Sequence, residues 1–275
     1  TFGETSRGVV ALSDAGSGSG GTVDVTVIGT TSTQGNNSGG VVAESTGATS
    51  GGAVTVDQQG DVSTLGNTSI GVSAKSSSSA GTGGTVDVTV TGNTVTGDPD
   101  AGTGDDSIGI FAQSVGPTGA DTVTVLQDGY VATYGERATG IEARSEGGSG
   151  SGGLVDVDVT GFTATFGNDA TGVHALSSGD VAGGAVDVWN QSSVETYGER
   201  STGVLAESLS GPGSGGTVDV RVDGLTHTEG NESDGIVAQS VGGTGADAVT
   251  VQTVDVETFG ETSRGVVALS DAGSG

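Results

Sequence analysis

Apolar and polar residues alternate strictly along short segments of this chain. In residues 23–27, Val-Asp-Val-Thr-Val, every second residue is a valine, and the same alternation returns at 86–90, 155–159 and 218–222. Successive side chains of a β-strand point to opposite faces, so the valines share one face. Other segments shorten the pattern to Val-x-Val followed by a polar residue, as at 54–58 and 123–127. Each of these segments is therefore predicted to be a β-strand with one buried face.

A second alternating pattern, Gly-Val/Ile-x-Ala-x-Ser, predicts a strand with a narrower inner face. Its first copy places Val9, Ala11 and Ser13 on one side, and an alanine stands at the same place in all nine copies. We therefore expect the opposite wall to lie close to this strand. Glycine-rich segments such as 16–21 follow it and predict a corner, because glycine tolerates tight turns. A third, short strand ends each unit, with an inner residue that alternates between threonine and valine.

These strands belong to a repeat of about 32 residues. The units begin at Thr1, Thr33, Thr64, Thr96, Thr133, Thr165, Thr196, Thr228 and Thr258, at intervals of 30 to 32 residues with one of 37. Residues 1–18 return unchanged at 258–275, whereas the first two units agree at only eight of those eighteen positions. The sequence therefore predicts that residues 1–275 form one segment of a longer array copied in blocks of 257 residues. A polymer with the same helical repeat would give the same pattern.

Stacking of such units predicts an all-β fold, a right-handed parallel β-helix with one three-strand unit per coil and eight to nine coils. A single coil cannot bury its own inner face, but neighbouring coils supply both the core and the backbone hydrogen bonds. A two-sided solenoid with two coils of about 16 residues per unit remains the rival. The two halves of a unit do not resemble each other, which favours the three-sided fold.

The composition narrows the possible partners. The chain has 56 glycines, no cysteine or methionine, 3% aromatic residues and a formal net charge of -27 with only seven Lys and Arg residues. This charge argues against binding to nucleic acid, because phosphate contacts require basic side chains. No apolar run is long enough for a transmembrane helix, so we expect no membrane insertion of this segment. Cations, water and further copies of the chain are the expected partners, and the lack of cysteine fits a secreted repeat protein.

The segments Gly-Ile-Val-Ala-Gln-Ser at 235–240 and Gly-Gly-Thr-Val-Asp-Val at 215–220 resemble the repeats of autotransporter passenger domains and related giant adhesins of Gram-negative bacteria. The resemblance extends over the whole chain. It implies an extracellular fibre at a bacterial cell surface. We expect a structural, non-enzymatic segment of such a fibre, with the stalk of an adhesin as the alternative and a polysaccharide-active or ice-binding β-helix as the third possibility.

An acidic column is the strongest candidate for a metal site. Asp156, Asp187 and Asp219 occupy the same outward position in three successive units. Stacked coils would place them about 4.8 Å apart, where like charges repel. A bound Ca²⁺ would relieve this repulsion, and a solvated acidic face is the alternative interpretation. No other cofactor is expected.

Two further surfaces are candidate contact sites. The Thr-x-Gly corner carries an aromatic residue in five copies, which would stack on a sugar ring or a neighbouring fibre, or cap the edge of a coil: Phe2, Tyr134, Phe166, Tyr197 and Phe259. An apolar strip on the outer side of the first strand predicts lateral pairing of fibres: Val10, Val42, Phe111, Leu205, Val237 and Val267. The widened fourth unit, residues 98–106, could cover part of this strip.

No catalytic residues are expected, because near-identical coils leave no specialised cleft. His174 and His227 lie far apart in coil order and have no obvious partner. The pairs Glu136–Arg137 and Glu199–Arg200 are interpreted as surface ion pairs of little energetic value. Ice binding would require the rows of threonine to face outward.

Overall fold

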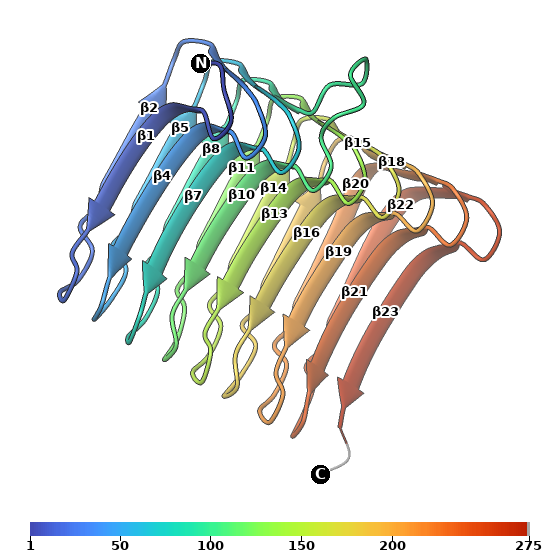
Figure 1. The fold of residues 1–275 in the computed structure, drawn as a ribbon. Helices are drawn as coiled ribbons and strands as arrows, with labels where there is room; N and C mark the ends of the chain where they lie inside the picture. Colours follow the sequence, from blue (N-terminus) through green and yellow to red (C-terminus); the bar gives the residue numbers. More distant parts are fainter. Residues whose placement is uncertain (274–275) are drawn as a thin grey trace.

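The computed structural model describes residues 1–273, in which all regular structure is β-strand (Figure 1). No helix that could cross a membrane occurs in these residues. The first strands of the successive coils are β1 (Arg7–Asp14), β4 (Gly39–Gly47), β7 (Ile70–Ser78), β10 (Ile108–Val115), β13 (Thr139–Glu146), β16 (Thr171–Ser178), β19 (Thr202–Leu209), β21 (Asp234–Gly242) and β23 (Arg264–Ala272). These nine strands form one parallel sheet in that order, which confirms the predicted β-helix.

Two shorter strands complete each of the first six coils. The second strands are β2 (Val23–Val27), β5 (Val54–Gln58), β8 (Val86–Val90), β11 (Val123–Gln127), β14 (Val155–Val159) and β17 (Val186–Asn190). The third strands are β3 (Thr31–Gln34), β6 (Val62–Leu65), β9 (Thr94–Thr96), β12 (Val131–Tyr134), β15 (Thr163–Phe166) and β18 (Val194–Tyr197). Coils seven and eight replace both with one longer strand, β20 (Val218–Glu229) and β22 (Val249–Phe259). The bend between second and third strands shrinks there to a register shift between Val222 and Leu225.

The register assigns one coil to each unit. Val9 pairs with Val41, Ala11 with Ala43 and Ser13 with Ser45, so equivalent residues of neighbouring units lie side by side. This spacing of about 32 residues excludes the rival with two coils per unit. In Figure 1 the first strands run downward in front, the shorter strands return behind them and the coils advance from left to right. The winding is therefore right-handed.

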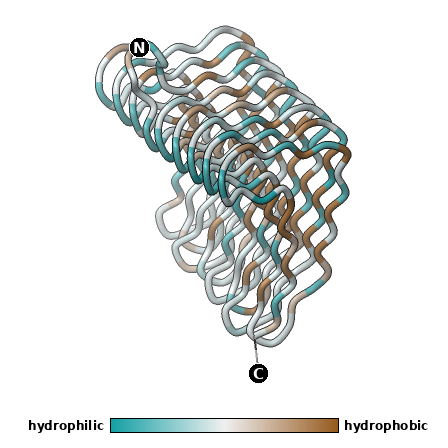
Figure 2. The backbone as a smooth tube through the Cα atoms, turned by 90° about the vertical axis from the view of Figure 1, so that its right-hand side faces the viewer, coloured by the Kyte–Doolittle hydropathy of each residue, from teal (hydrophilic) through white to brown (hydrophobic). Residues whose placement is uncertain are grey.

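The core consists of columns of small aliphatic side chains that run along the axis. The alanines of β4 to β21 have no exposed surface, and neither do the isoleucines Ile110, Ile141 and Ile236. Figure 2, which looks along the stack, shows hydrophobic residues (brown) at equivalent places in successive coils. The threonine column is also buried, since Thr33, Thr64, Thr96, Thr133, Thr165, Thr196 and Thr228 are 0% exposed. These rows face inward and cannot present the outward surface that ice binding would need.

The inward serine of the first strand ties that strand to the glycine corner. In coil six the Ser177 hydroxyl donates to the Gly153 carbonyl at 2.7 Å and accepts the Gly184 backbone N–H at 2.8 Å. The same pair of hydrogen bonds occurs at Ser45, Ser76, Ser145 and Ser208. A buried backbone group without a partner is costly, so the serine stabilises the corner in addition to its isolated parallel bridges, such as that between Ser151 and Ala182.

Glycine is required where the first strand approaches the third strand. A Cβ on Gly172 would lie 2.3 Å from Val194 Cγ1 and 2.6 Å from the carbonyl oxygen of Gly203 in the next coil. Both distances are far below van der Waals contact, and one of the two atoms belongs to the backbone. The narrow cross-section predicted from the alanine column thus extends to the start of the same strand.

Candidate functional site

The predicted acidic column lies on the outer face of the second strands. Asp156 pairs in register with Asp187, and Asp187 pairs with Asp219. Burial and the neighbouring charge of Asp158 raise the pKa of Asp156. Burial raises the pKa of Asp187 too, and the charges of Asp156 and Asp219 add to that effect. The charges of both neighbours in the column thus act on Asp187.

A cation–π pair borders this column. The guanidinium of Arg221 lies 4.9 Å from the ring centroid of Trp189, the residue that pairs with it from the preceding coil. Both side chains bind the same carboxylate, since Trp189 Nε1 donates to Asp223 at 2.9 Å and Arg221 Nε donates to it at 3.1 Å. Together with the acidic column these two side chains line a shallow hollow. Arg221 thus supplies positive charge next to the column.

The geometry gives no support to the predicted Ca²⁺ site. Within residues 1–273 no group of three or more His, Cys, Asp or Glu side chains is arranged to hold a metal ion. A row of carboxylates on adjacent strands presents one oxygen pair per coil along a line, whereas Ca²⁺ needs six to eight oxygens around a point. The column is an acidic face, and Ca²⁺ binding there stays a prediction.

The predicted aromatic residues form a ladder on the outer face of the third strands. The rings of Tyr134 and Phe166 are stacked with centroids 4.9 Å apart, and those of Phe166 and Tyr197 are 5.1 Å apart. His227 continues the ladder, 5.8 Å from Tyr197 and 5.3 Å from Phe259. Stacking is thus confirmed for Tyr134, Phe166 and Tyr197, whereas the His227 ring is tilted against Tyr197 and Phe259. Phe2 is 83% exposed and stands outside the ladder.

A second aromatic pair lies beside this ladder and was not anticipated. Tyr130 and Phe162 stack at 5.5 Å, one residue before the third strands begin. Ala132 and Ala164 lie between the two stacks and are fully buried. The sequence signal was available, because Tyr130 and Phe162 are aromatic at equivalent positions of neighbouring units.

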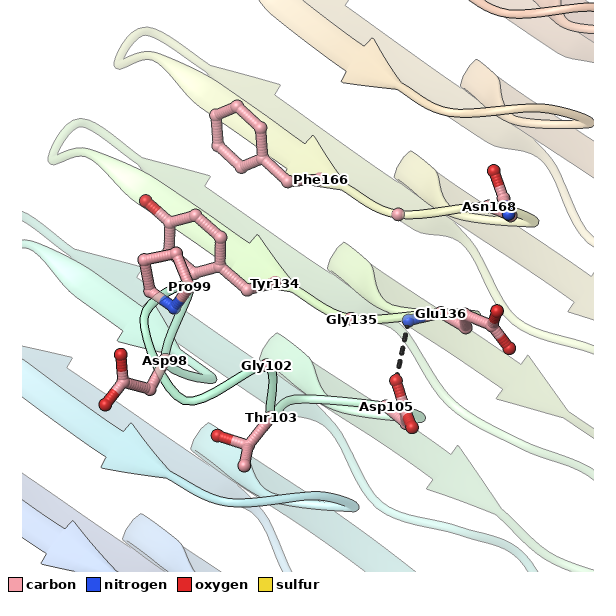
Figure 3. Close-up of a pocket in the computed structure, with 11 residues that line it drawn as sticks. Asp98, Pro99, Gly102, Thr103, Asp105, Tyr134, Gly135, Glu136, Phe166 and Asn168 are labelled. Carbon is pink, nitrogen blue, oxygen red and sulfur yellow. Dashed lines mark hydrogen bonds between the residues drawn. The ribbon is translucent and has the colours of Figure 1, made fainter.

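The widened segment of unit four packs against the aromatic ladder. It projects from the stack as the green excursion in Figure 1 and closes on itself through an antiparallel bridge between Asp98 and Thr103. Figure 3 shows Pro99 next to the Tyr134 ring, with Phe166 one coil further along. The segment therefore borders the third face. The expectation that it covers the apolar strip of the first strand was wrong.

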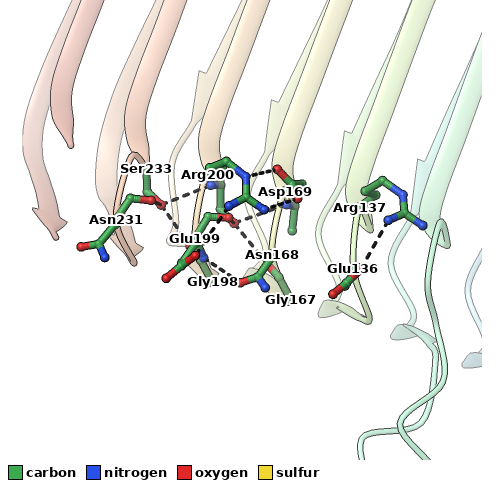
Figure 4. A network of polar contacts seen from close by, with 12 residues as sticks. Glu136, Arg137, Gly167, Asn168, Asp169, Gly198, Glu199, Arg200, Asn231 and Ser233 are labelled. Carbon is green, nitrogen blue, oxygen red and sulfur yellow. Dashed lines mark hydrogen bonds and ion pairs between the residues drawn. The ribbon is translucent and has the colours of Figure 1, made fainter. Parts of the chain in front are cut away.

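Charged residues of the Thr-x-Gly turns form a second column (Figure 4). Arg137 Nε lies 2.7 Å from Asp106, and Arg200 Nε lies 2.7 Å from Asp169. The arginines reach their sequence neighbours Glu136 and Glu199 at only 3.4 and 3.5 Å. The predicted pairs with the adjacent glutamates are thus present. The closer partner of each arginine is an aspartate, because the turn directs the arginine toward the preceding coil.

Asparagine side chains extend this column through the backbone. Asn168 Oδ1 accepts the Glu199 N–H at 2.9 Å, and Asn231 Oδ1 accepts the Glu261 N–H at 2.9 Å. Asp105 does the same for Glu136. In every turn the residue directly after this backbone donor position has a positive φ, for example 56° at Arg137 and 57° at Asp169. The side chain thus satisfies a backbone donor that the turn would leave without a partner in the ladder.

Both histidines have carboxylate partners from adjacent coils. His174 Nε2 lies 3.1 Å from Glu207, and His174 Nδ1 lies 4.0 Å from Glu142. Burial alone would raise the pKa of Glu207, but hydrogen bonds from His174 and Gln239 outweigh it and leave that pKa lowered. His227 lies between Glu229 and Glu257 at 3.2 and 3.4 Å. The expectation that the histidines have no partner was wrong. The partners of His174 and one partner of His227, Glu257, come from adjacent coils, and Glu229 lies two residues from His227 on the same strand.

The apolar strip on the first face is interrupted. Its column reads Val10, Val42, Ser73, Phe111, Glu142, His174, Leu205, Val237 and Val267 in register. Val42 is only 7% exposed, whereas Val10 is 43% exposed. Polar residues thus divide the predicted strip into short apolar stretches near the two ends of the stack. This face therefore has no continuous apolar strip for the lateral pairing of fibres.

All these groups share one arrangement, because each is a column on the outside of the stack. The carboxylates, aromatic rings and ion pairs repeat from coil to coil, and shallow hollows lie beside the acidic column and the aromatic ladder. No match to the chain was found among protein-family models, curated proteins or solved structures.

Proposed function

We propose that this chain is a structural segment of a long extracellular fibre at a bacterial surface, with no catalytic role. The observation that carries this proposal is the unbroken register of nine first strands, whose inner residues are the same small side chains in coil after coil. A fold of this kind grows by adding identical rungs, and each added rung buries the face of the previous one. Each added coil therefore makes the rod longer.

Two physical properties support the mechanical role. The backbone hydrogen bonds of the sheets run along the fibre axis, so stretching the rod would have to break whole ladders of them. Nine stacked first strands extend over roughly 38 Å at the usual strand spacing. The net charge of -27 keeps neighbouring rods apart and soluble. Stiffness and solubility are the properties that a surface fibre requires.

Immunogold labelling of the source cells tests this proposal. Antibodies raised against the purified chain are expected to decorate thin filaments that extend from intact cells. Labelling that appears only after the cells are lysed would contradict the extracellular assignment. Labelling of compact particles would contradict the fibre.

An adhesive role is the second candidate, and the aromatic ladder favours it. Tyr134, Phe166 and Tyr197 present three stacked rings on one face, and aromatic faces pack well against the apolar faces of sugars. A glycan array probed with the chain would detect such binding. Phe166→Ala is expected to abolish it and Phe2→Ala to leave it unchanged, because Phe2 stands alone in coil one. Equal binding by both variants would contradict a role for the ladder.

A further inference from the structure

A trough runs along the stack beside the aromatic ladder. Its floor is the glycine of each Thr-x-Gly turn, such as Gly135 and Gly167, which has no side chain to fill the space. In Figure 3 the rings of Tyr134 and Phe166 lie on one side of this floor, and the polar side chains that follow the glycines lie on the other side. The turn sequence therefore gives the trough one apolar side and one polar side.

The widened segment of unit four forms an end wall of this trough. Pro99 and Thr103 line a hollow of about 380 Å³ together with the two rings and the two glycines, and this volume is within the range of small-molecule sites. The wall is held in shape, because Asp98 and Thr103 exchange two backbone hydrogen bonds of 3.1 Å. Asn67 Oδ1 anchors the end of the segment by accepting the Gly104 N–H at 2.7 Å. A ligand would therefore meet a preformed site.

The opposite side of the widened segment provides a comparison within the same trough. There the trough continues over Gly35 and Gly66 in a hollow of about 310 Å³. Gln34 and Leu65 take the places that the ladder occupies further along the stack. None of the described residues that line this second hollow is aromatic. The two hollows thus share the wall and the glycine floor and differ in the aromatic rings.

The polar side of the aromatic hollow offers both acceptors and donors of hydrogen bonds. Asp105 and Glu136 supply carboxylate oxygens, of which one on Asp105 accepts the Glu136 N–H at 2.9 Å. Asn168 uses its Oδ1 for the Glu199 N–H, also at 2.9 Å, and its amide N–H donors have no partner within residues 1–273. Hydroxyl groups can donate to carboxylates and accept from an amide. This side therefore suits a ligand that is rich in hydroxyl groups.

Charge restricts the class of ligand. The carboxylates of Asp98, Asp105 and Glu136 line the hollow, and none of the described lining residues is basic. Arg137, which follows Glu136, pairs with Asp106 at 2.7 Å. A uronic acid or a sulfated sugar would bring further negative charge beside these carboxylates, and like charges in an interface are costly. An uncharged ligand fits the hollow better.

The backbone of the floor argues against a peptide strand as the ligand. Gly135 donates its N–H to the Phe166 carbonyl at 2.9 Å, so the floor uses its backbone groups between coils and cannot pair with an added strand. A saturated ring suits the apolar side, since the pyrrolidine ring of Pro99 already lies next to the Tyr134 ring in Figure 3. The pyranose rings of a glycan present C–H groups of the same kind.

We propose that the hollow between the widened segment and the aromatic ladder binds an uncharged glycan. Tyr134 and Phe166 contact the C–H groups of a sugar ring, and Glu136 and Asn168 bind its hydroxyl groups. The widened segment closes one end of the site, so the glycan chain extends along the trough and parallel to the fibre axis. This proposal rests on the adhesive role, the second candidate above, and specifies its site and its class of ligand.

Binding measurements with charged and uncharged probes test the class of ligand. The purified chain is applied to an array of uncharged gluco-, manno-, galacto- and N-acetylglucosamine oligosaccharides, with oligogalacturonates and decaproline as the other probes. Calorimetric titration then measures Kd for the bound probes. An uncharged oligosaccharide is expected to bind on the order of tenfold more tightly than the oligogalacturonate. Equal or tighter binding of the oligogalacturonate or of decaproline would overturn the proposal.

A conservative substitution tests the polar side of the site. Asn168→Asp keeps an oxygen for the Glu199 N–H but removes the amide donors, so it is expected to weaken glycan binding about two- to tenfold. Asn231→Asp is the matched control, because Asn231 makes the same hydrogen bond to the Glu261 N–H at 2.9 Å in a turn outside the hollow. Equal values of Kd for the two variants would contradict the role of Asn168.

Removal of residues 98–103 tests the end wall. Gly97 then precedes Gly104 directly, and the loss of six residues shortens the unit from 37 to 31 residues, within the range of the other units. Glycan binding on the order of tenfold weaker is expected, because the preformed wall is lost. Circular dichroism checks that the shortened chain keeps its β-structure. Unchanged affinity of the folded variant would refute the end wall.

Phe166→Ala separates this proposal from the adhesive role itself. Glycan binding that is lost in Phe166→Ala but unchanged in Asn168→Asp and in the shortened chain would refute this site and leave adhesion through the ladder. Absence of binding by the parent chain to every glycan of the array would refute both. The labelling of cells tests the fibre independently of these results.

Discussion

The first strands of coils six and nine have the same pattern but different surroundings. Val173 in β16 is fully buried, whereas Val266, at the same position of β23, exposes 44% of its surface. A Cβ on Gly172 would collide with Val194 and Gly203, whereas a Cβ on Gly265 would meet nothing within 4 Å. The alternation of each strand is thus the same, and the two strands differ in whether residues 1–273 include a following coil.

This difference shows that burial in the solenoid is supplied from outside each coil. A coil folds its apolar face toward an axis, but the next coil closes that face. The position of a residue in the repeat therefore predicts which way its side chain points. The position of its coil in the stack determines how deeply that side chain is buried. Pairs of equivalent residues from coils six and nine can separate the two contributions.

Gly172→Ala should give the largest effect. The new methyl group would press on the backbone of coil seven, and overpacking of this kind costs about 3 kcal/mol of the free energy of unfolding. Gly265→Ala should change the free energy by much less, because no atom lies near its Cβ. Urea unfolding monitored by circular dichroism measures both. Equal losses would show that the terminal coil is covered in solution.

Ser177→Ala should give the next largest loss. Removal of this hydroxyl leaves the Gly184 N–H and the Gly153 carbonyl without their partner in a buried corner. Such a loss costs about 2 kcal/mol. Ser270 is exposed, and within residues 1–273 its hydroxyl has a hydrogen bond only to the Asp247 carbonyl, so Ser270→Ala should be milder in the same urea experiment. A Ser177→Ala variant as stable as the parent would contradict the structural role of this hydroxyl.

Asp187→Asn should stabilise the protein at neutral pH. Burial, together with the charges of Asp156 and Asp219, raises the pKa of Asp187 in the folded state. The folded state therefore binds this proton more tightly than the unfolded state, so the ionised carboxylate destabilises the fold at pH 7. The advantage of the variant should vanish below about pH 4, where both states are protonated. Thermal unfolding at a series of pH values measures it.

Asp24→Asn is the control for this variant. Asp24 lies at the same position in coil one, where its neighbour in register is Thr55. Its substitution should not raise the melting temperature as Asp187→Asn does. A similar rise in both variants would mean that net charge, and not the local column, limits stability.

Asp169→Asn should have the smallest effect, and with the opposite sign. The hydrogen bond from Arg200 lowers the pKa of Asp169, so the ion pair contributes stability above the unfolded pKa of Asp. This contribution is lost as the pH falls through the folded pKa, and salt weakens it because both side chains are exposed. A double-mutant cycle with Arg200→Gln measures the pair. Additive effects would show that the pair makes no net contribution.

The alternating pattern predicted the strands, the register and the narrow core correctly. The alanine column is buried throughout β4 to β21, and the units stack one per coil. The aromatic ladder was predicted from Tyr134, Phe166 and Tyr197, because identical spacing in a solenoid implies contact. These successes share one cause, since repetition converts sequence position directly into spatial position.

Contacts between unlike residues could not be predicted in the same way. Arg200 pairs with Asp169 of the preceding coil and only weakly with the adjacent Glu199, because a backbone turn with positive φ sets the direction of the side chain. His174 lies beside Glu207, which stands 33 residues later. The merger of two strands in β20 and β22 depends on a bulge of a few residues that the repeat pattern does not encode.

The sequence by itself determined the fold, because nine copies of one alternating unit can bury their valines and alanines only by stacking. Tertiary structure alone decided which charges pair and which rings extend the ladder. The physical reason is distance. The alternation that defines a strand acts over a few residues, whereas each outward side chain finds its partner about one coil away, in a direction that the backbone turn sets.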